Sequence, residues 1–258
     1  ADGEGWINAS DLSTTDNRIE AVQKVLNEKY NNQESISVYV KQLDTDRIAA
    51  INDEKSMYAA SVAKLGVLYY TQERLSQKKL SLSDEYQYTS AVNGFPGAYD
   101  PDGSGKISKM PDDKNYSLEN LLKAVAQNSD NVATNILGYY VANQYDNSFQ
   151  KSVDEAAATS WNMDKKELTA KAAGTLMEAV YRQNGDIINY LSSTDYDGER
   201  ISKNIDVPVA HKIGDAYDFK HDVAIVYTDS PFILSIFTDK EGYDKITSIA
   251  DDVYGILK

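Results

Sequence analysis

Strand-like segments at both ends of the chain, separated by a helical middle, constrain the fold of this sequence more than any other feature. Residues 36–40 alternate apolar and polar side chains, as a half-buried strand does, and a turn at 44–46 leads to a second strand at 48–51. After Pro208 the strand pattern returns, over residues 209–213, 223–227 and 232–237. The simplest assembly is one antiparallel sheet built from both ends of the chain.

Helical periodicity predicts a helix over residues 17–30, with Asp16 as its N-cap, and a terminal helix after Gly242. Between the two groups of strands, residues 92–116 form a loop rich in Gly, Pro and Asp. The remaining predicted helices start at Ser61, at Ser117, at about residue 131 and at about residue 169. The middle of the chain therefore carries little strand signal.

We expect an α+β fold in which an antiparallel five-stranded sheet is flanked by helices and an all-helical subdomain is inserted. The 258 residues are expected to form one domain. Its sheet subdomain would take residues from about 1–60 plus 200–258, and its helical subdomain about 61–199.

The composition excludes several classes of function. Asp and Glu number 40 against 26 Lys and Arg, and the net charge of −14 repels nucleic acid and anionic lipid. The absence of cysteine excludes disulfides, thiolate catalysis and Cys-based metal sites. There is no Walker loop and no Gly-x-Gly-x-x-Gly segment after a strand. We therefore expect no cofactor and no metal.

No apolar run approaches the ~20 residues of a membrane span, and no signal peptide is recognisable. We interpret the start, Ala1 to Gly5, as a processed or truncated N-terminus.

Ser61-Val62-Ala63-Lys64 is the first segment that could carry chemistry. A serine at a helix N-terminus lies near the positive end of the helix dipole, and a lysine three residues later lies on the same face. A desolvated lysine has a lowered pKa and could take the serine proton without any histidine. Ser-x-x-Lys also occurs at Ser76 and Ser148, but only Lys64 lies inside an apolar helix. The alternative is an ordinary N-cap serine and a lysine that extends its ammonium to solvent.

Two further segments could complete a site. The Ser129-Asp130-Asn131 triplet falls between two predicted helices, where it could present a hydroxyl and an amide to a cleft, or simply cap a helix. Lys212-Ile213-Gly214 lies at the end of a predicted strand. There the lysine could hold a substrate carboxylate, and the glycine would let a ligand approach the backbone. Each segment is a weak signal alone.

Together the three segments resemble those of the serine β-lactamase and penicillin-binding protein superfamily, and class A most closely. Ser-Asp-Asn follows Ser61 by 68 residues, and the Lys-x-Gly lysine follows Ser129 by 83. The resemblance also includes the hairpin before Ser61, Thr169–Ala173 and the strands after Val207, and so covers most of the chain. It implies a β-lactamase/transpeptidase-like fold.

The resemblance implies a catalytic role for four residues. Ser61 would be the acylated nucleophile, and Lys64 its base partner. Ser129 would pass a proton to the leaving nitrogen, and Lys212 would support the substrate carboxylate and the field around Ser129.

The resemblance also implies a set of substrate-binding residues. Asn131 would bind the amide side chain of the substrate. The N–H groups of Ser61 and Asp215, beside Gly214, would form the oxyanion hole. Arg200 would be a second anchor for the carboxylate.

Three departures from the family pattern matter. Class A enzymes carry a Glu-x-x-Leu-Asn segment whose glutamate activates the deacylating water, and this chain has none. Ile213 stands where the family has Thr or Ser, so a hydroxyl is missing. Asp215 would put a carboxylate beside the oxyanion hole. We therefore expect the acyl-enzyme to be hydrolysed slowly.

A calcium-loop-like segment and a high tyrosine content each have a functional and a structural interpretation. Residues 100–107 resemble the first half of a calcium loop, but position 12 is Pro111, and a solvated turn is the better interpretation. The 19 tyrosines are interpreted as packing residues rather than the lining of a glycan- or peptide-binding cleft. Tyr99 is expected near the mouth of the cleft.

The sequence thus predicts a β-lactamase-like serine hydrolase that acts on β-lactams or on peptidoglycan stem peptides. Two alternatives stay open: a non-hydrolytic penicillin-binding module or pseudo-enzyme, and a D-alanyl-D-alanine carboxypeptidase. The substrate class implies an extracytoplasmic protein, secreted or lipid-anchored, and we expect a monomer.

Overall fold

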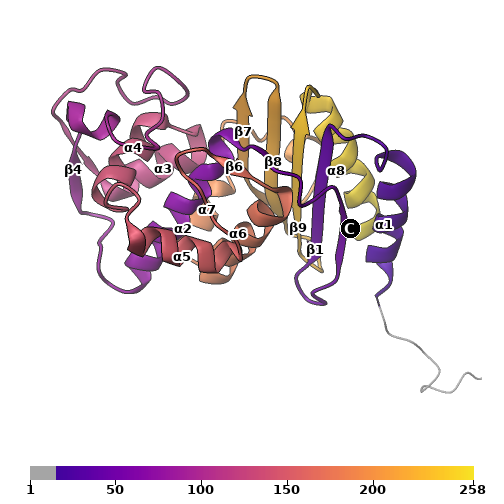
Figure 1. Cartoon of the computed structure of the whole chain (residues 1–258). Helices are drawn as coiled ribbons and strands as arrows, with labels where there is room; N and C mark the ends of the chain where they lie inside the picture. The colour runs from indigo at the N-terminus through magenta and orange to yellow at the C-terminus, as the bar shows by residue number, and fades with distance from the viewer. Residues whose placement is uncertain (1–15) are drawn as a thin grey trace, which may run out of the picture.

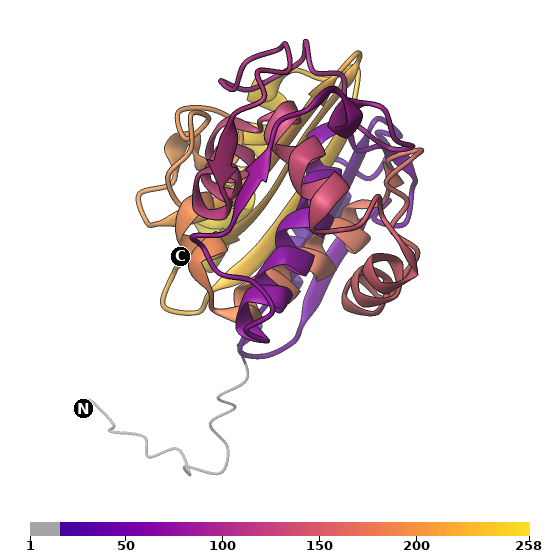
Figure 2. The ribbon, with the colours of Figure 1, turned by 90° about the vertical axis from the view of Figure 1, so that its left-hand side faces the viewer.

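The computed structural model describes residues 16–258, so the predicted processed N-terminus lies outside the described residues. Figure 1 shows a sheet with two helices against one of its faces and a cluster of helices beyond the other. Seen from the left-hand side of Figure 1, the cluster lies in front of the strands (Figure 2). This confirms the predicted α+β fold.

The sheet has five strands in the order β2-β1-β9-β8-β7, and every neighbouring pair is antiparallel. The strands are β1 (Ile36–Gln42), β2 (Ile48–Ile51), β7 (Val209–Ala216), β8 (Phe219–Val226) and β9 (Phe232–Asp239). Strands from the start and the end of the chain meet where β1 pairs with β9. The prediction of one sheet built from both ends is confirmed.

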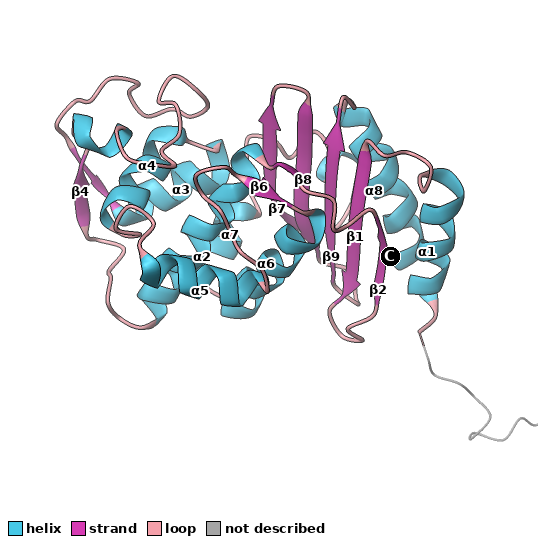
Figure 3. Cartoon of the chain, in the orientation of Figure 1, coloured by secondary structure: helices cyan, strands magenta, loops and turns pink. Residues whose placement is uncertain are grey.

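Both faces of this sheet are covered, and the alternation of side chains along β1 shows how. Val38 and Val40 pack into the cluster beneath α1 (Arg18–Lys29) and α8 (Tyr243–Leu257). Tyr39, between them, packs into the larger cluster on the other face. Figure 3 shows α1 and α8 together on the outer side of the strands. Since successive side chains of a strand point to opposite faces, one short strand contributes to two cores.

Helix α6 (Ala170–Gln183) covers the inner face of the sheet and contacts β1, β8 and β9. Its Gly174 permits the approach, because a Cβ at that position would lie 2.6 Å from Tyr39 Cδ1. The helix thereby links the sheet to the helical cluster. The predicted subdomain boundaries near residues 60 and 200 stay a prediction.

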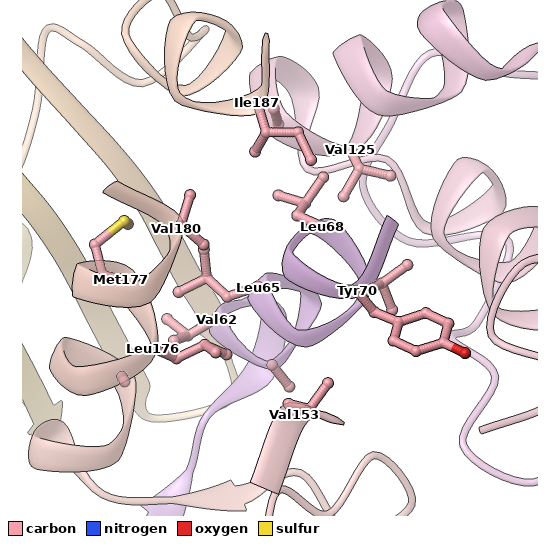
Figure 4. Close-up of a cluster of buried hydrophobic side chains, with 14 of the residues drawn as sticks. Val62, Leu65, Leu68, Tyr70, Val125, Val153, Leu176, Met177, Val180 and Ile187 are labelled. Atoms are coloured by element: carbon pink, nitrogen blue, oxygen red, sulfur yellow. The ribbon is translucent and has the colours of Figure 1, made fainter. Parts of the chain in front are cut away.

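The helical cluster surrounds α2 (Leu65–Ser76), whose apolar side chains meet those of its neighbours (Figure 4). Leu65 and Leu68 are fully buried there. The other helices are α3 (Leu118–Asn128), α4 (Asn131–Tyr140), α5 (Asn147–Ala157) and α7 (Asp186–Leu191). Each buried leucine contributes roughly 1.5–3 kcal/mol of transfer free energy, so this packing holds α2 firmly in place.

The structure also contains short elements that the sequence did not predict. Two small ladders pair β3 (Met57–Tyr58) with β6 (Glu167–Leu168), and β4 (Glu85–Gln87) with β5 (Asn115–Ser117). Two or three residues are too few to show a period of two. Helices α5 and α7 were missed as well. Only three residues of α5 are buried, so its apolar stripe is faint.

The remaining elements within the described residues are the 3-10 helices η2 (Ala60–Lys64), η3 (Ser90–Asn93) and η4 (Ser202–Asn204). The predicted helix from Ser61 therefore begins one residue earlier and as a 3-10 turn. No helix within residues 16–258 is long and apolar enough to cross a membrane.

Candidate active site

Ser61 lies at the start of η2, directly after the β3 ladder. Ala60, just before it, has φ +48°, a left-handed conformation that is uncommon for residues other than glycine. The Ala59 N–H donates to Lys166 O at 2.7 Å, which fixes the entry into the turn. Ser61 makes no side-chain cap hydrogen bond in η2, so the interpretation of Ser61 as an ordinary N-cap is wrong.

Strand β7 runs against η2, and Gly214 makes this possible. A Cβ on Gly214 would lie 2.5 Å from Ala59 O and 3.2 Å from Val62 N. Any side chain would push the strand away from the nucleophile turn. The space beside Gly214 is thus filled by backbone, and the predicted approach of a ligand to this glycine stays a prediction.

Lys64 is fully buried, so the interpretation of Lys64 as a lysine that extends to solvent is wrong. Its Nζ donates to Ser129 O at 2.6 Å and to Asn131 Oδ1 at 2.5 Å, and lies 3.4 Å from Ser129 Oγ. Burial holds the pKa of Lys64 well below its usual value, and the nearby charge of Lys212 adds to this effect. A lysine in this state can hold an unprotonated amine and act as a base.

Ser129 connects the two lysines of the site. It has φ +52° at the C-terminal cap of α3, which turns the chain sharply before α4. Lys212 Nζ donates to Ser129 Oγ at 2.8 Å and to Ile213 O at 3.0 Å. Burial lowers the pKa of Lys212 to about 7. The Ser129 hydroxyl therefore lies between two amines that can exchange protons with it.

Asp130 performs the capping role that the sequence left open for the triplet. Its Oδ1 accepts from Ala133 N at 2.8 Å and caps α4. Its Oδ2 accepts from Lys106 N at 2.6 Å and Ile107 N at 2.9 Å. The same carboxylate thus caps a helix and binds the loop that covers the site.

The calcium-like segment 100–107 is this covering loop. A Cβ on Gly103 would lie 2.2 Å from Asn131 Nδ2, and one on Gly105 would lie 2.2 Å from Asp130 Oδ2. Both glycines therefore let the loop pack directly on the triplet. Within the described residues 16–258, no group of three or more His, Cys, Asp or Glu side chains could hold a metal ion.

Both polar atoms of the Asn131 side-chain amide form hydrogen bonds within the protein. Its Oδ1 accepts from Lys64, and its Nδ2 donates to Asp100 O at 2.7 Å. Ser104 Oγ supports the same corner by donating to Ser129 O at 2.9 Å. A substrate amide would have to replace one of these contacts, so the predicted binding role of Asn131 stays a prediction.

A pocket of about 220 Å³ opens in front of Ser61. It is lined by Tyr58, Ala60, Ser61, Tyr99, Asp100, Gly103, Ser104, Asn131, Asp215, Ala216 and Tyr217. Tyr99 lies in the wall, as expected, and its hydroxyl donates to Ala60 O at 3.1 Å. Lys64, Ser129 and Lys212 are buried behind the wall. Of the four predicted catalytic residues, Ser61 lines the pocket, whereas Lys64, Ser129 and Lys212 are joined to one another by hydrogen bonds.

Arg200 lies behind Asp215 instead of in the pocket wall. Its Nη2 donates to Asp215 Oδ2 at 2.9 Å, its Nη1 pairs with Glu199, and its guanidinium lies 3.8 Å from the Tyr243 ring centroid. Lys220 Nζ binds the other Asp215 oxygen at 2.7 Å. Sequence reasoning missed Lys220 and Tyr243, because nothing in their spacing links them to position 215.

Sequence reasoning also missed Lys166, in the segment where the family has its glutamate. Its Nζ donates to Gly97 O at 3.0 Å and Met163 O at 2.9 Å, and lies 4.5 Å from the Tyr99 ring centroid. Trp161, in the same segment, donates its indole N–H to Ala63 O at 3.1 Å. This segment is therefore bound tightly to the nucleophile turn, and no acidic residue from it lines the pocket.

Both histidines are buried away from the pocket wall. His211 Nδ1 lies 3.0 Å from Asp222, and its Nε2 lies 3.1 Å from Asp197 and from Thr194. Burial opposes the charged imidazole, but Asp222 and Asp197 outweigh it and raise the pKa of His211 to about 9. His221 Nε2 binds Tyr58 O at 2.8 Å, and burial lowers its pKa to about 4.

Comparison with families and curated proteins gives one match. A family model described as "Beta-lactamase enzyme family" matches residues 17–257. No curated protein matches the sequence.

Solved structures share the fold at low identity. The structure of PBP-A has a TM-score of 0.75 at 14% identity and covers 93% of this chain and 96% of its own. TLA-1 extended-spectrum β-lactamase has a TM-score of 0.72 at 19% identity and covers 93% and 99%. A β-lactamase from Sphaerobacter thermophilus has a TM-score of 0.71 at 15% identity and covers 93% and 95%.

Proposed function

Because the chain belongs to the β-lactamase enzyme family, we propose that it is a serine acyl-transfer hydrolase that forms its acyl-enzyme at Ser61. The observation that carries the proposal is the buried amine of Lys64, which follows Ser61 by one turn and is bonded to Ser129 and Asn131. A buried lysine without a carboxylate partner is costly unless its neutral form is used.

Acylation would begin with transfer of the Ser61 proton to the neutral Lys64 amine. The Ser61 oxygen then attacks the carbonyl carbon of the substrate, and the carbonyl electron pair moves onto its oxygen. The backbone N–H groups of Ser61 and Asp215 are the proposed donors to that oxyanion. Collapse of the intermediate breaks the carbon–nitrogen bond. Ser129 gives its proton to the leaving nitrogen and recovers one from Lys64.

For deacylation, residues 16–258 offer no comparable set of groups around the pocket. The segment that would supply a carboxylate base contributes Lys166, whose ammonium is bound to two carbonyl oxygens. Without a base to activate water, the ester at Ser61 should persist. A PBP-A mutant has been solved as an acyl-enzyme complex with penicillin G, which supports β-lactams as probes of this fold.

The same observation favours a second candidate, a penicillin-binding module or pseudo-enzyme that acylates once and does not turn over. A D-alanyl-D-alanine carboxypeptidase is the third. In each case the acyl donor is a β-lactam or a peptidoglycan stem peptide. The location we propose is extracytoplasmic, secreted or lipid-anchored, and the protein would act as a monomer.

Intact-mass spectrometry during incubation with penicillin G tests the proposal. An adduct at Ser61 that decays while the drug is consumed indicates a hydrolase, and a lasting adduct indicates the penicillin-binding alternative. Ser76→Ala, in the second Ser-x-x-Lys segment, is the matched control and should behave as the parent does. If Ser61→Ala and the parent both stay free of adduct, acyl transfer at Ser61 is wrong.

A further inference from the structure

The charged groups of the pocket wall are all acidic. Among the eleven residues that line it are Asp100 and Asp215, whereas none is Lys or Arg. The wall also contains Tyr58, Tyr99 and Tyr217. A donor with a carboxylate beside its reactive carbonyl would therefore face carboxylates and phenol rings when it enters.

The two cations at the Asp215 end of this wall are already paired with Asp215. Arg200 is 1% exposed, and its Nη2 binds Asp215 Oδ2, while Lys220 binds Oδ1. Tyr243 donates its hydroxyl to the same Oδ2. Asp215 thus occupies the cations that could otherwise bind a substrate carboxylate.

The buried lysines do not replace these cations. Lys212 Nζ donates to Ser129 Oγ and Ile213 O, and Lys64 Nζ donates to Ser129 and Asn131. Both are fully buried and bonded inside the protein, and burial lowers the pKa of Lys212 to about 7, so that this lysine is only partly charged at neutral pH. Ile213 adds no hydroxyl to this corner.

Two tyrosines form an aromatic rim at the Asp215 end of the pocket. The ring centroids of Tyr58 and Tyr217 are 5.9 Å apart, and Tyr217 is 85% exposed. Faces of phenol rings attract ammonium groups and offer nothing to a carboxylate. The exposed ring of Tyr217 has no packing role that would explain it.

We propose that this site selects acyl donors that are neutral or carry an ammonium group near the reactive carbonyl, and that it disfavours donors with a carboxylate there. The proposal rests on the function proposed above, acylation of Ser61. The ligand class is an amidated or amine-bearing peptide or lactam, held by the Tyr58–Tyr217 rim and the carboxylate of Asp215.

The test compares three forms of one β-lactam: penicillin G, its neutral methyl ester and a cationic aminoethyl amide. Acylation of Ser61 is followed by intact mass. For each compound, the rate with the parent protein is divided by the rate with Asp215→Asn, so that differences in the intrinsic reactivity of the compounds cancel. Asp215→Asn frees Arg200 and Lys220, so penicillin G should react about tenfold faster relative to the ester. Asp218→Asn, in the same hairpin but outside the wall, is the matched control and should leave the ratios unchanged.

Tyr217→Ala is a second variant whose folding is not in question, since the side chain is exposed. It should slow the cationic amide more than it slows penicillin G. If the parent protein reacts faster with penicillin G than with either derivative, and Asp215→Asn leaves that order unchanged, the charge preference is wrong while acylation stands. If none of the three compounds acylates Ser61, the proposed function fails and the preference with it.

Discussion

The two sides of the pocket differ in what they can do for a reaction. On one side, Lys64 and Lys212 both reach the Ser129 hydroxyl, at 3.4 and 2.8 Å. On the other side, residues 158–169 pack behind the wall residue Tyr99 and do not line the pocket themselves, and the side chains of Trp161 and Lys166 donate to backbone carbonyls. The first arrangement can move protons, whereas the second can only hold positions. Under the proposed function, formation of the acyl-enzyme and its hydrolysis would depend on separate parts of this fold.

Removal of the Lys64 amine should have the largest effect. Lys64→Met keeps the buried stem but removes the base, and we expect the second-order rate of acylation to fall about 10³-fold. Stopped-flow acylation or timed intact mass measures it. Lys79→Met, in the second Ser-x-x-Lys segment, should keep the parent rate. An equal loss of rate in Lys64→Met and Lys79→Met would show that the Lys64 amine has no specific role in acylation.

Ser129→Ala should lower the same rate about 10²-fold, because the leaving nitrogen loses its proton donor. The helix cap made by Asp130 stays intact, so the unfolding temperature should change little. A rate within twofold of the parent would mean that the proton reaches the leaving group without Ser129.

The pH dependence of acylation should report Lys212. Burial lowers its pKa to about 7, so the side chain loses its proton as the pH rises through neutrality. For an anionic donor such as penicillin G, the rate should decline several-fold between pH 6 and pH 8. Lys212→Arg stays protonated throughout this range and should remove the decline. A parent profile that rises through neutrality would contradict the assignment.

Lys166→Met tests whether the hydrogen bonds of Lys166 to Gly97 O and Met163 O matter for acylation. Two hydrogen bonds from a charged donor are lost, and we expect about 1–3 kcal/mol less stability and a rate of acylation that falls about threefold to tenfold. The charge of Lys166 helps to lower the pKa of Lys64, so the acidic limb of the rate profile should move to higher pH. A change in stability without this shift would limit Lys166 to a structural role.

Replacement of His211 should have the smallest effect on acylation, because this residue lies away from the pocket, and its effect should be on stability instead. Its folded-state pKa is raised from 6.5 to about 9, so the stabilisation by Asp222 and Asp197 is fully present below pH 6.5 and is lost as the pH rises through about 9. The unfolding temperature should therefore drop between about pH 6.5 and about pH 9 and level off above that. His211→Gln should remove most of this dependence, as followed by circular dichroism.

Long, regular elements could be predicted from the sequence because their packing leaves a period. The alternation at 36–40 predicts a half-buried strand, and the periodicity at 131–141 predicts α4. The strand is present, but the structure buries both of its faces. Short ladders leave no period, and β3 is fixed by its pairing with β6, more than a hundred residues away. Predictions failed where non-local contacts decide the structure.

The candidate site divides in the same way. Ser61, Lys64, Ser129 and Lys212 could be found because their order resembles a known family. Lys166 could not, because its partners are backbone carbonyls that impose no residue type on the sequence. The pairing of Arg200 with Asp215 was missed as well. Arg200 was predicted to bind a substrate carboxylate, but in the structure its guanidinium donates to the carboxylate of Asp215.

The close packing around Gly214 limits how this edge of the sheet can change in evolution. Position 214 cannot acquire a side chain without separating β7 from η2, since Ala59 O is already at 2.5 Å from where a methyl group would be. Mutation at position 214 therefore offers no route to a new substrate preference. Diversification has to proceed through neighbours whose side chains already reach the opening, chiefly Asp215 and Tyr217.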